Sequence, residues 1–279
     1  MGQLHAHGHP GDLLDGLLSP GRAAHWLAGL FARKPLRVLF VGNSLTYYRA
    51  PGPGAAPVLN DLPGLLARMS ASRGERRPLR AARVSEDGAS LEDHLRGSLL
   101  EGALRAGAWD YVVLQESSER VRARPAALRR DARLLDARIR AAGARSALFS
   151  TWSESGRPQA AARCGRACAE AAGELGVPLV PVAQAWRLAA ARSPQPALRM
   201  RDGLHPGPDG AYLSACVFYA WLYGDSLQAC GAAALADDER AVAELRAAHG
   251  LPPAGSALGP LRAIAREAVL GARAQGRRA

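Results

Sequence analysis

The sequence predicts an α/β protein with a parallel sheet and helices on both faces of that sheet. Two observations lead to this class. Short apolar runs alternate with longer stretches of helical periodicity, which is typical of strand–helix–strand units. The runs are also continuously apolar, as in VLFV and YVVL, and this indicates strands that are buried on both faces.

Five runs are expected to form the strands. Each is brief and apolar, and each is followed by turn-forming or small polar residues; they cover residues 36–41, 79–84, 110–115, 146–151 and 178–182. In open α/β sheets, ligands bind beyond the carboxyl ends of the strands. The residues that directly follow these runs are therefore the first candidates for a functional site.

Helices are expected between the strands and after the last one. The stretches with helical periodicity cover residues 55–72, 90–104, 125–142, 158–175, 182–191 and 208–223, with two more near 237–249 and 260–274. Gly250 and Pro260 act as stop and start signals for the last two. Because no repeat or long linker is evident, we expect one domain over 36–232. An N-terminal tail and lead-in helix over 1–35 precede it, and a helical extension over 233–279 is expected to pack on it.

The composition is that of an ordinary soluble globular protein, with 48% hydrophobic and 22% charged residues among 279. No apolar stretch reaches the roughly 20 residues that a membrane-spanning helix needs. The first residues, MGQLHAHGHPGDLLDGLL, lack both the basic and the apolar region of a signal peptide. From the sequence as written we expect a cytoplasmic protein without a membrane partner.

The net charge of +11 raises the possibility of a nucleic-acid partner. Lys34 is the single lysine, however, and the other basic residues are arginines spread through the predicted helices. This skew is typical of a GC-rich coding sequence. No zinc-finger or helix-turn-helix signature accompanies the charge, so we expect no nucleic-acid partner.

Neither the cysteines nor the histidine-rich start of the chain predicts a metal site. The four cysteines are Cys164, Cys168, Cys216 and Cys230. Cys164 and Cys168 are one helical turn apart, but no second ligand pair is near them, and buried reduced thiols are the better interpretation. His5, His7 and His9 are interpreted as a frayed tail that binds metal incidentally. We expect no metal and no organic cofactor.

A serine, a histidine and an aspartate follow the predicted strands in a pattern typical of acyl transfer. Ser44 ends the run VLFVGNS, and Asp202 and His205 share the loop segment DGLHP. In such a site the serine is the nucleophile, the histidine its general base, and the aspartate fixes the imidazole tautomer. Three-residue spacing lets one tight loop present both Asp202 and His205 toward Ser44.

Three groups are expected to bind the oxyanion of the reaction: the backbone N–H of Ser44, that of Gly88 and the side-chain amide of Gln115. Each residue also has a purely structural interpretation. A serine often caps a turn, a glycine often has positive φ, and a strand-end amide often satisfies backbone groups. Their joint occurrence at these strand ends favours the enzyme.

The order of these blocks resembles the SGNH (GDSL-type) hydrolase superfamily over roughly residues 36–224. DGLHPGPDGAYLSA is the strongest match. Asn43 stands where the family usually has Asp, and VVLQES replaces Gly-x-Asn-Asp, with Gln115 in place of the oxyanion-hole Asn. The LQES segment, with TW after the next strand, is similar to a less studied branch of the domain-of-unknown-function type. The resemblance implies a three-layer α/β/α, flavodoxin-like fold with five parallel strands in the order 2-1-3-4-5.

Together these features predict a serine esterase for small acyl esters, with acetyl groups on a carbohydrate as the expected substrate. Asn43 holds the turn before the nucleophile and is a possible substrate contact. Trp152 and, less clearly, Tyr47 offer a stacking face for a sugar, although core packing explains Trp152 equally well. A sugar O-acyltransferase on the same fold is the alternative, and a ligand-binding member without catalysis is a third hypothesis. The sequence leaves open the acyl length, the alcohol and the oligomeric state.

Overall fold

The structure is a computed structural model that describes residues 34–50, 56–154, 157–192, 198–252 and 258–276. The chain divides into two compact units, residues 1–35 and 36–279. All elements below belong to the second unit. The expected tail and lead-in helix lie outside the described residues, apart from residues 34 and 35.

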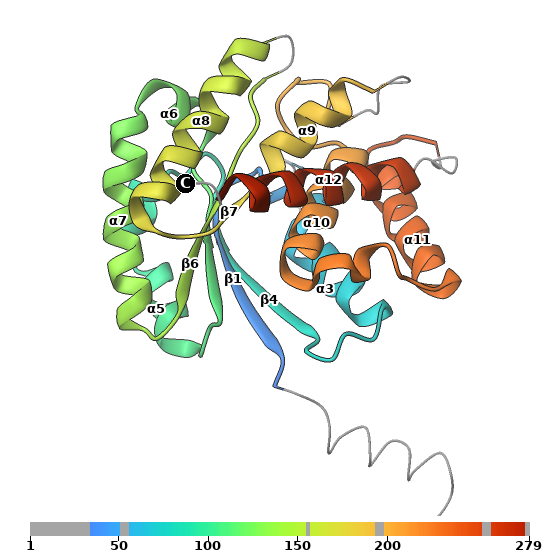
Figure 1. Ribbon diagram of the computed structural model, residues 1–279, viewed down its shortest axis with the longest axis horizontal. Helices are drawn as coiled ribbons and strands as arrows, with labels where there is room; N and C mark the ends of the chain where they lie inside the picture. Colours follow the sequence, from blue (N-terminus) through green and yellow to red (C-terminus); the bar gives the residue numbers. More distant parts are fainter. Residues whose placement is uncertain (1–33, 51–55, 155–156, 193–197, 253–257, 277–279) are drawn as a thin grey trace, which may run out of the picture. The chain divides into compact units, whose positions relative to one another are not determined.

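A parallel sheet of five strands forms the centre of the second unit (Figure 1). Its strands are β1 (Leu36–Gly42), β4 (Leu79–Ser85), β5 (Tyr111–Leu114), β6 (Arg145–Phe149) and β7 (Leu179–Val180). They lie in the order β4-β1-β5-β6-β7, and each pairs with its neighbour in parallel. Numbered by their order along the chain, these strands have the arrangement 2-1-3-4-5, so the predicted fold class and strand order are confirmed.

Helices cover both faces of the sheet (Figure 1). One group consists of α4 (Leu91–Arg96), α5 (Leu99–Ala106), α6 (Ser118–Ala123), α7 (Pro125–Ala141) and α8 (Pro158–Leu175). The other consists of α3 (Leu62–Ser72), α9 (Val182–Ala190), α10 (Pro208–Tyr223), α11 (Ala232–Ala248) and α12 (Leu258–Gly276), with the short 3₁₀ helix η1 (Gly224–Leu227) after α10.

Strand β1 contributes to two separate cores because successive side chains point to opposite faces of a sheet. Val38 and Phe40 lie in the core with α3, α9, α10 and α12. Leu39 and Val41 lie in the core with α4, α5, α7 and α8. All four are at most 1% exposed, which explains why this strand has no polar alternation. Polar side chains at the carboxyl edge of the sheet can therefore begin only where this buried strand ends.

The helix predicted over 55–72 is wrong in its first part. Residues 58–61 form a strand, β3 (Val58–Asp61), which pairs antiparallel with β2 (Tyr47–Arg49). The side chain of Asp61 then accepts the N–H of Gly64 at 2.9 Å and caps α3. The segment PGPG at 51–54 was the turn signal that favoured a hairpin here.

The single helix predicted over 90–104 is divided into α4 and α5. Gly97 follows α4 with φ −77° and ψ 155°, an extended conformation that ends the helix. The short helix α6 was not predicted at all. It begins where the Ser117 side chain accepts the N–H of Arg120, so a capping serine after β5 starts it.

Helices α11 and α12 belong to the same compact unit as the sheet. Leu261, Ile264 and Ala265 of α12 are buried in the core that also contains α9 and α10. Of the helices that the structure describes, none combines the length and apolarity needed to cross a membrane.

Candidate active site

A tight turn after β1 places Ser44 at the carboxyl edge of the sheet. The carbonyl of Asn43 accepts the N–H groups of Thr46 (2.9 Å) and Tyr47 (3.1 Å), and its side-chain oxygen accepts the N–H of Leu45 at 3.1 Å. Asn60 of β3 donates to the carbonyls of Ser44 (3.3 Å) and Leu45 (3.0 Å). The turn is therefore held from within and from the β2–β3 hairpin.

The structure brings Ser44, His205 and Asp202 into one chain of hydrogen bonds. His205 Nε2 lies 2.9 Å from Ser44 Oγ, and His205 Nδ1 lies 2.8 Å from Asp202 Oδ2. With the imidazole proton on Nδ1, Asp202 accepts a hydrogen bond from Nδ1–H, and Nε2 is left to accept one from the Ser44 hydroxyl. The structure thus brings the three residues together, and their catalytic roles stay a prediction.

The carboxylate of Asp202 also holds the backbone of its own loop. Its Oδ1 accepts the N–H of Leu204 at 2.8 Å and that of His205 at 2.9 Å. Burial acts to raise the pKa of Asp202, but these backbone donors and the His205 side chain outweigh it, so the pKa lies below its ordinary value. Asp202 is thus kept ionised, as an orienting carboxylate must be.

Trp152 does not lie at the rim of the site, and its expected contact with substrate is wrong. It is 1% exposed and stacks on Trp186 with ring centroids 3.6 Å apart. Its indole N–H donates to the carbonyl of Leu204 at 2.8 Å. Trp152 therefore packs in the core, the alternative interpretation given above, and supports the loop that carries His205.

Tyr48, rather than Tyr47, is the aromatic residue beside the base. The Tyr48 ring stacks on the His205 imidazole at a centroid distance of 4.5 Å and an angle of 13°. Tyr47 instead lies under the guanidinium of Arg83. Tyr48 was not predicted as a site residue because the β2–β3 hairpin was not predicted. Adjacent tyrosines of one strand point to opposite faces.

Gln115 does not reach over the pocket as expected. It is completely buried, and its Oε1 accepts the N–H of Asn43 (2.9 Å) and the hydroxyl of Thr46 (3.0 Å). Its Nε2 donates to Asn43 Oδ1 (3.0 Å) and to the carbonyl of Glu116 (2.9 Å). Because both amide protons have acceptors, Gln115 has none left for an oxyanion, and the predicted third donor is wrong.

Gln115 and Asn43 instead fix the turn that carries Ser44. The Asn43 side chain is buried, and its Nδ2 donates to the carbonyl of Ala89 at 2.9 Å, so Asn43 ties this turn to the loop after β4 rather than presenting its amide to substrate. A Cβ at Gly42 would collide with Gln115 Oε1. The glycine before Asn43 is thus required by the close approach of Gln115.

Two backbone donors remain for an oxyanion. In the part of the chain that the structure describes, neither the N–H of Ser44 nor that of Gly88 has a hydrogen-bond acceptor. Gly88 has a φ of 72°, a conformation that favours glycine, and both residues line the same cavity. Their role as oxyanion donors stays a prediction.

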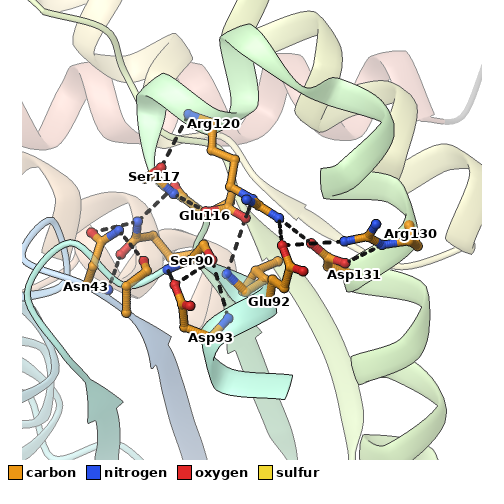
Figure 2. Close-up of polar contacts among 12 residues, drawn as sticks. Asn43, Ser90, Glu92, Asp93, Glu116, Ser117, Arg120, Arg130 and Asp131 are labelled. Carbon is orange, nitrogen blue, oxygen red and sulfur yellow. Dashed lines mark hydrogen bonds and ion pairs between the residues drawn. The ribbon is translucent and has the colours of Figure 1, made fainter. Parts of the chain in front are cut away.

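A buried carboxylate, Glu116, joins the segment after β5 to the start of α4 (Figure 2). Glu116 is 3% exposed. Its Oε1 accepts the N–H of Ser117 (2.7 Å) and its Oε2 accepts that of Leu91 (3.2 Å), which begins α4 after the Gly88 loop. Burial raises the pKa of Glu116, against the lowering effect of these donors and of Arg120.

Arg120 connects Glu116 to further charges on α4 and α7 (Figure 2). Its Nε lies 3.3 Å from Glu116 Oε2, and its Nη2 pairs with both Glu92 and Asp131. Arg130 adds a second guanidinium beside Asp131 and Glu92. The buried carboxylates are therefore paired, which is what their removal from water requires.

These elements surround a cavity of about 370 Å³. Its lining includes Asn43, Ser44, Leu45, Tyr48, Asp87, Gly88, Ser117, Arg122, Ser153, Arg157, Leu204 and His205. Ser44, Gly88 and His205 thus line one space, of a size typical of small-molecule sites. Among the described residues, no cluster of three or more metal-ligating side chains occurs.

No protein-family model and no curated protein matches the sequence, whereas solved structures do. A protein of Slackia heliotrinireducens, described as an SGNH hydrolase, is 29% identical with a TM-score of 0.55, over 68% of this chain and all of that one. A DUF4886 family protein from Bacteroides uniformis is 16% identical (TM-score 0.56; 86% and 95% covered). An acetylxylan esterase from Geobacillus stearothermophilus is 15% identical (TM-score 0.54; 70% and 98% covered). The last two show similarity of fold alone.

Proposed function

Because this chain belongs to the SGNH hydrolase superfamily and is an ester hydrolase, we propose that it cleaves small acyl esters through an acyl-enzyme on Ser44. Acetyl esters of carbohydrates are the proposed substrates. The observation that carries the proposal is the hydrogen-bond chain from Ser44 to His205 (2.9 Å) and from His205 to Asp202 (2.8 Å).

In the first half of the reaction, Ser44 Oγ attacks the carbonyl carbon of the ester while His205 Nε2 takes its proton. Asp202 stabilises the imidazolium and keeps its orientation. The negative charge on the former carbonyl oxygen is accepted by the N–H groups of Ser44 and Gly88. The C–O bond to the alcohol then breaks, and the alcohol leaves with the proton from His205.

In the second half, water replaces the alcohol. His205 takes a proton from this water, whose oxygen attacks the acyl carbon. The bond to Ser44 Oγ breaks, Ser44 recovers the proton from His205, and the carboxylic acid is released. If a sugar hydroxyl took the place of this water, the same site would act as an O-acyltransferase.

Two observations support a small acyl group. The cavity around Ser44 has a volume of about 370 Å³, which is at the lower end of the range for small-molecule sites. An acetylxylan esterase is also among the proteins of similar fold. At 15% identity its activity does not transfer to this chain without a test, so the acetyl group is part of the proposal.

The test combines active-site labelling with a substrate series. A fluorophosphonate should label the wild-type protein and Ser153→Ala, which changes another serine of the same cavity, but not Ser44→Ala. Among p-nitrophenyl esters from acetyl to octanoyl, the acetyl ester should have the highest kcat/KM. Ser44→Ala and His205→Ala should each lower kcat by on the order of 10³–10⁶, because the residues of such a unit fail together.

Two results would contradict the proposal. Labelling that persists in Ser44→Ala would remove Ser44 as nucleophile, and wild-type kcat in His205→Ala would require another base. Measuring both the carboxylic acid released in water and the acyl group transferred to an added sugar distinguishes a hydrolase from an O-acyltransferase.

A further inference from the structure

A second cavity adjoins the one that contains Ser44. It has a volume of about 380 Å³ and is lined by Arg122 of α6 and by the start of α8, with Arg157, Pro158, Gln159, Ala160 and Arg163. Arg122, Arg157 and Ala160 line both cavities. The two spaces therefore adjoin at these three residues. We call this second space the arginine cavity.

The charges of the arginine cavity have one sign. Three arginines line it, and among the described residues no carboxylate does. Arg157 pairs with Glu154 at 3.1 Å. Within the described residues, the side chains of Arg122 and Arg163 take part in no hydrogen bond or ion pair, so their donors are available to a ligand.

Arg122 and Arg163 come from different helices, yet their charges act on the same place. Burial raises the pKa of the Cys164 thiol, while the charges of both arginines act to lower it. Both guanidiniums thus lie within electrostatic reach of one buried atom. Positive charge is therefore concentrated at this end of α6 and α8.

The cavity around Ser44 has charges of both signs. Asp87, Glu119 and Glu154 line it together with Ser44, His205 and the two shared arginines, Arg122 and Arg157. An anion is repelled by these carboxylates and attracted toward the arginines at the boundary of the two cavities and in the arginine cavity. The charge pattern therefore orients a substrate that is neutral at its ester and negative at its other end.

We propose that the arginine cavity binds an anionic group, a carboxylate or a phosphate, on the ester whose acyl group reacts at Ser44. This inference rests on the proposed esterase function and specifies its substrate class. The planar guanidinium offers paired N–H donors that match the two oxygens of such a group. Sugar acids and sugar phosphates that carry an acyl ester have this combination of groups.

The experiment compares substrates that carry the anionic group with matched substrates that are neutral. An O-acetylated methyl glucuronoside and its carboxamide form the first pair, and an O-acetylated glucose phosphate with the corresponding glucose acetate forms the second. The wild-type kcat/KM ratio of charged to neutral substrate should be about tenfold or more, as hydrogen bonds to charged groups allow. It should fall as salt is added, because exposed charges are screened.

Two variants and a control locate the effect. Arg122→Gln and Arg163→Gln should each lower the ratio severalfold, whereas Arg166→Gln, also on α8 but lining a different cavity, should leave it at the wild-type value. The substrate pair with the larger kcat/KM ratio of charged to neutral form shows whether carboxylate or phosphate is the preferred group. Calorimetric binding of free glucuronate and of glucose phosphate to Ser44→Ala gives a readout that needs no turnover, and both arginine variants should weaken it.

The outcomes separate the two proposals. If p-nitrophenyl acetate is hydrolysed but the ratio is near one, or is unchanged in both arginine variants, the anion site is wrong and the esterase remains. If the wild-type protein neither hydrolyses any ester nor reacts with fluorophosphonate, the proposed function fails. The anion site, as part of an esterase, then fails with it.

Discussion

Gln115 and Glu116 follow one another at the end of β5 and hold different parts of the site. Gln115 turns toward β1 and bonds the N–H of Asn43 at 2.9 Å. Glu116 turns toward α4 and α6 and bonds the N–H groups of Leu91 and Ser117 at 3.2 and 2.7 Å. One strand end therefore fixes both the turn of the proposed nucleophile and the start of α4 behind the Gly88 loop. These contacts make Glu116 a positioning residue in the proposed reaction.

Replacing Glu116 with Gln tests this positioning. A carboxylate accepts both backbone N–H groups, whereas an amide turns its NH₂ toward one of them and leaves two donors facing each other. Glu116→Gln should lower kcat by about 10- to 100-fold through misplaced oxyanion donors, with little change in KM. The free energy of unfolding should fall by about 1–3 kcal/mol because one buried donor loses its acceptor.

Glu92→Gln is the matched control for Glu116→Gln. Glu92 pairs with Arg96, Arg120 and Arg130 in the same network, as Figure 2 shows in part, but it bonds neither loop of the pocket. Glu92→Gln should lower the free energy of unfolding, while its kcat should stay near that of wild type. Equal kcat in the two variants at similar stability would mean that Glu116 has only a structural role.

The position of a residue in the sequence predicted which residues lie at the edge of the sheet, but not where their side chains point. Ser44, Asp202 and His205 could be placed at one sheet edge because the ends of parallel strands meet there, and the structure brings them within hydrogen-bond distance. Gln115 and Trp152 were assigned to the pocket by the same argument, and both side chains turn inward. The direction of a side chain depends on tertiary neighbours such as Thr46 and Trp186, which no local pattern reveals.

At the scale of elements, short strands need additional links to stay in register. β5 has four residues, and Asp110 directly before it ties it to β1. Asp110 Oδ2 accepts the N–H of Arg37 at 2.8 Å, and Oδ1 pairs with Arg77 at 2.8 Å. Burial acts to raise the pKa of Asp110, but these partners outweigh it and the pKa lies below its ordinary value of 3.8. The carboxylate therefore stabilises the folded state in its ionised form.

This shift predicts how the stability of the sheet depends on pH. Since the pKa of Asp110 is lower in the folded state, its contribution is fully present above about pH 3.8 and is lost as the pH falls through the folded value. Asp110→Asn should lower the free energy of unfolding by about 1 kcal/mol near neutral pH. The difference in unfolding free energy between wild type and Asp110→Asn should become smaller below about pH 3.8.

Urea unfolding of wild type and variant at neutral and at acidic pH measures this difference. Glu170→Gln, at a carboxylate whose side chain is 61% exposed, should change stability little at either pH. A difference between wild type and Asp110→Asn that is constant with pH would show that the ionised carboxylate is not responsible.

The elements differ in how well their sequence signals predicted them. α8 and α10 were predicted with the ends that they have, because Pro158 and Pro208 mark the first turn and glycines follow the last. The β2–β3 hairpin was missed because only two short segments form it, and their apolar residues also fit a helical start. Gly97 divided a predicted helix by its extended conformation, although an isolated glycine in a helical pattern is often tolerated.

At the scale of the whole unit, the C-terminal helices complete the core under one face of the sheet. Leu258, Leu261, Ile264, Ala265, Ala268 and Val269 of α12 are each at most 4% exposed. They share a core with α9 and α10, and α10 follows the loop that carries Asp202 and His205. The boundary expected at residue 232 therefore does not separate these helices from the packing that supports the site. The sequence predicted that these helices pack on the domain but not which surface they cover, because amphipathic periodicity does not name that surface.

One pair of variants on α12 tests this dependence. Leu261 is 2% exposed and Leu270 is 42% exposed on the same helix. Leu261→Ala removes buried methyl groups and leaves a cavity, so the free energy of unfolding should fall by about 2–5 kcal/mol. Tm should decrease by roughly 4–20 °C, at about 2–4 °C for each kcal/mol in a unit of this size. Leu270→Ala removes the same atoms from an exposed position and should change Tm little.

The two variants also show how the fold supports the proposed active site. If α12 stabilises the whole unit rather than the pocket alone, Leu261→Ala should retain kcat for p-nitrophenyl acetate at temperatures well below its Tm and lose activity together with its structure on heating. Circular dichroism and activity, followed through the same temperature ramp, should give one midpoint for each variant. A Tm of Leu261→Ala equal to that of Leu270→Ala would mean that α12 is not part of the core. Loss of activity well below the unfolding midpoint would mean that α12 acts on the site directly.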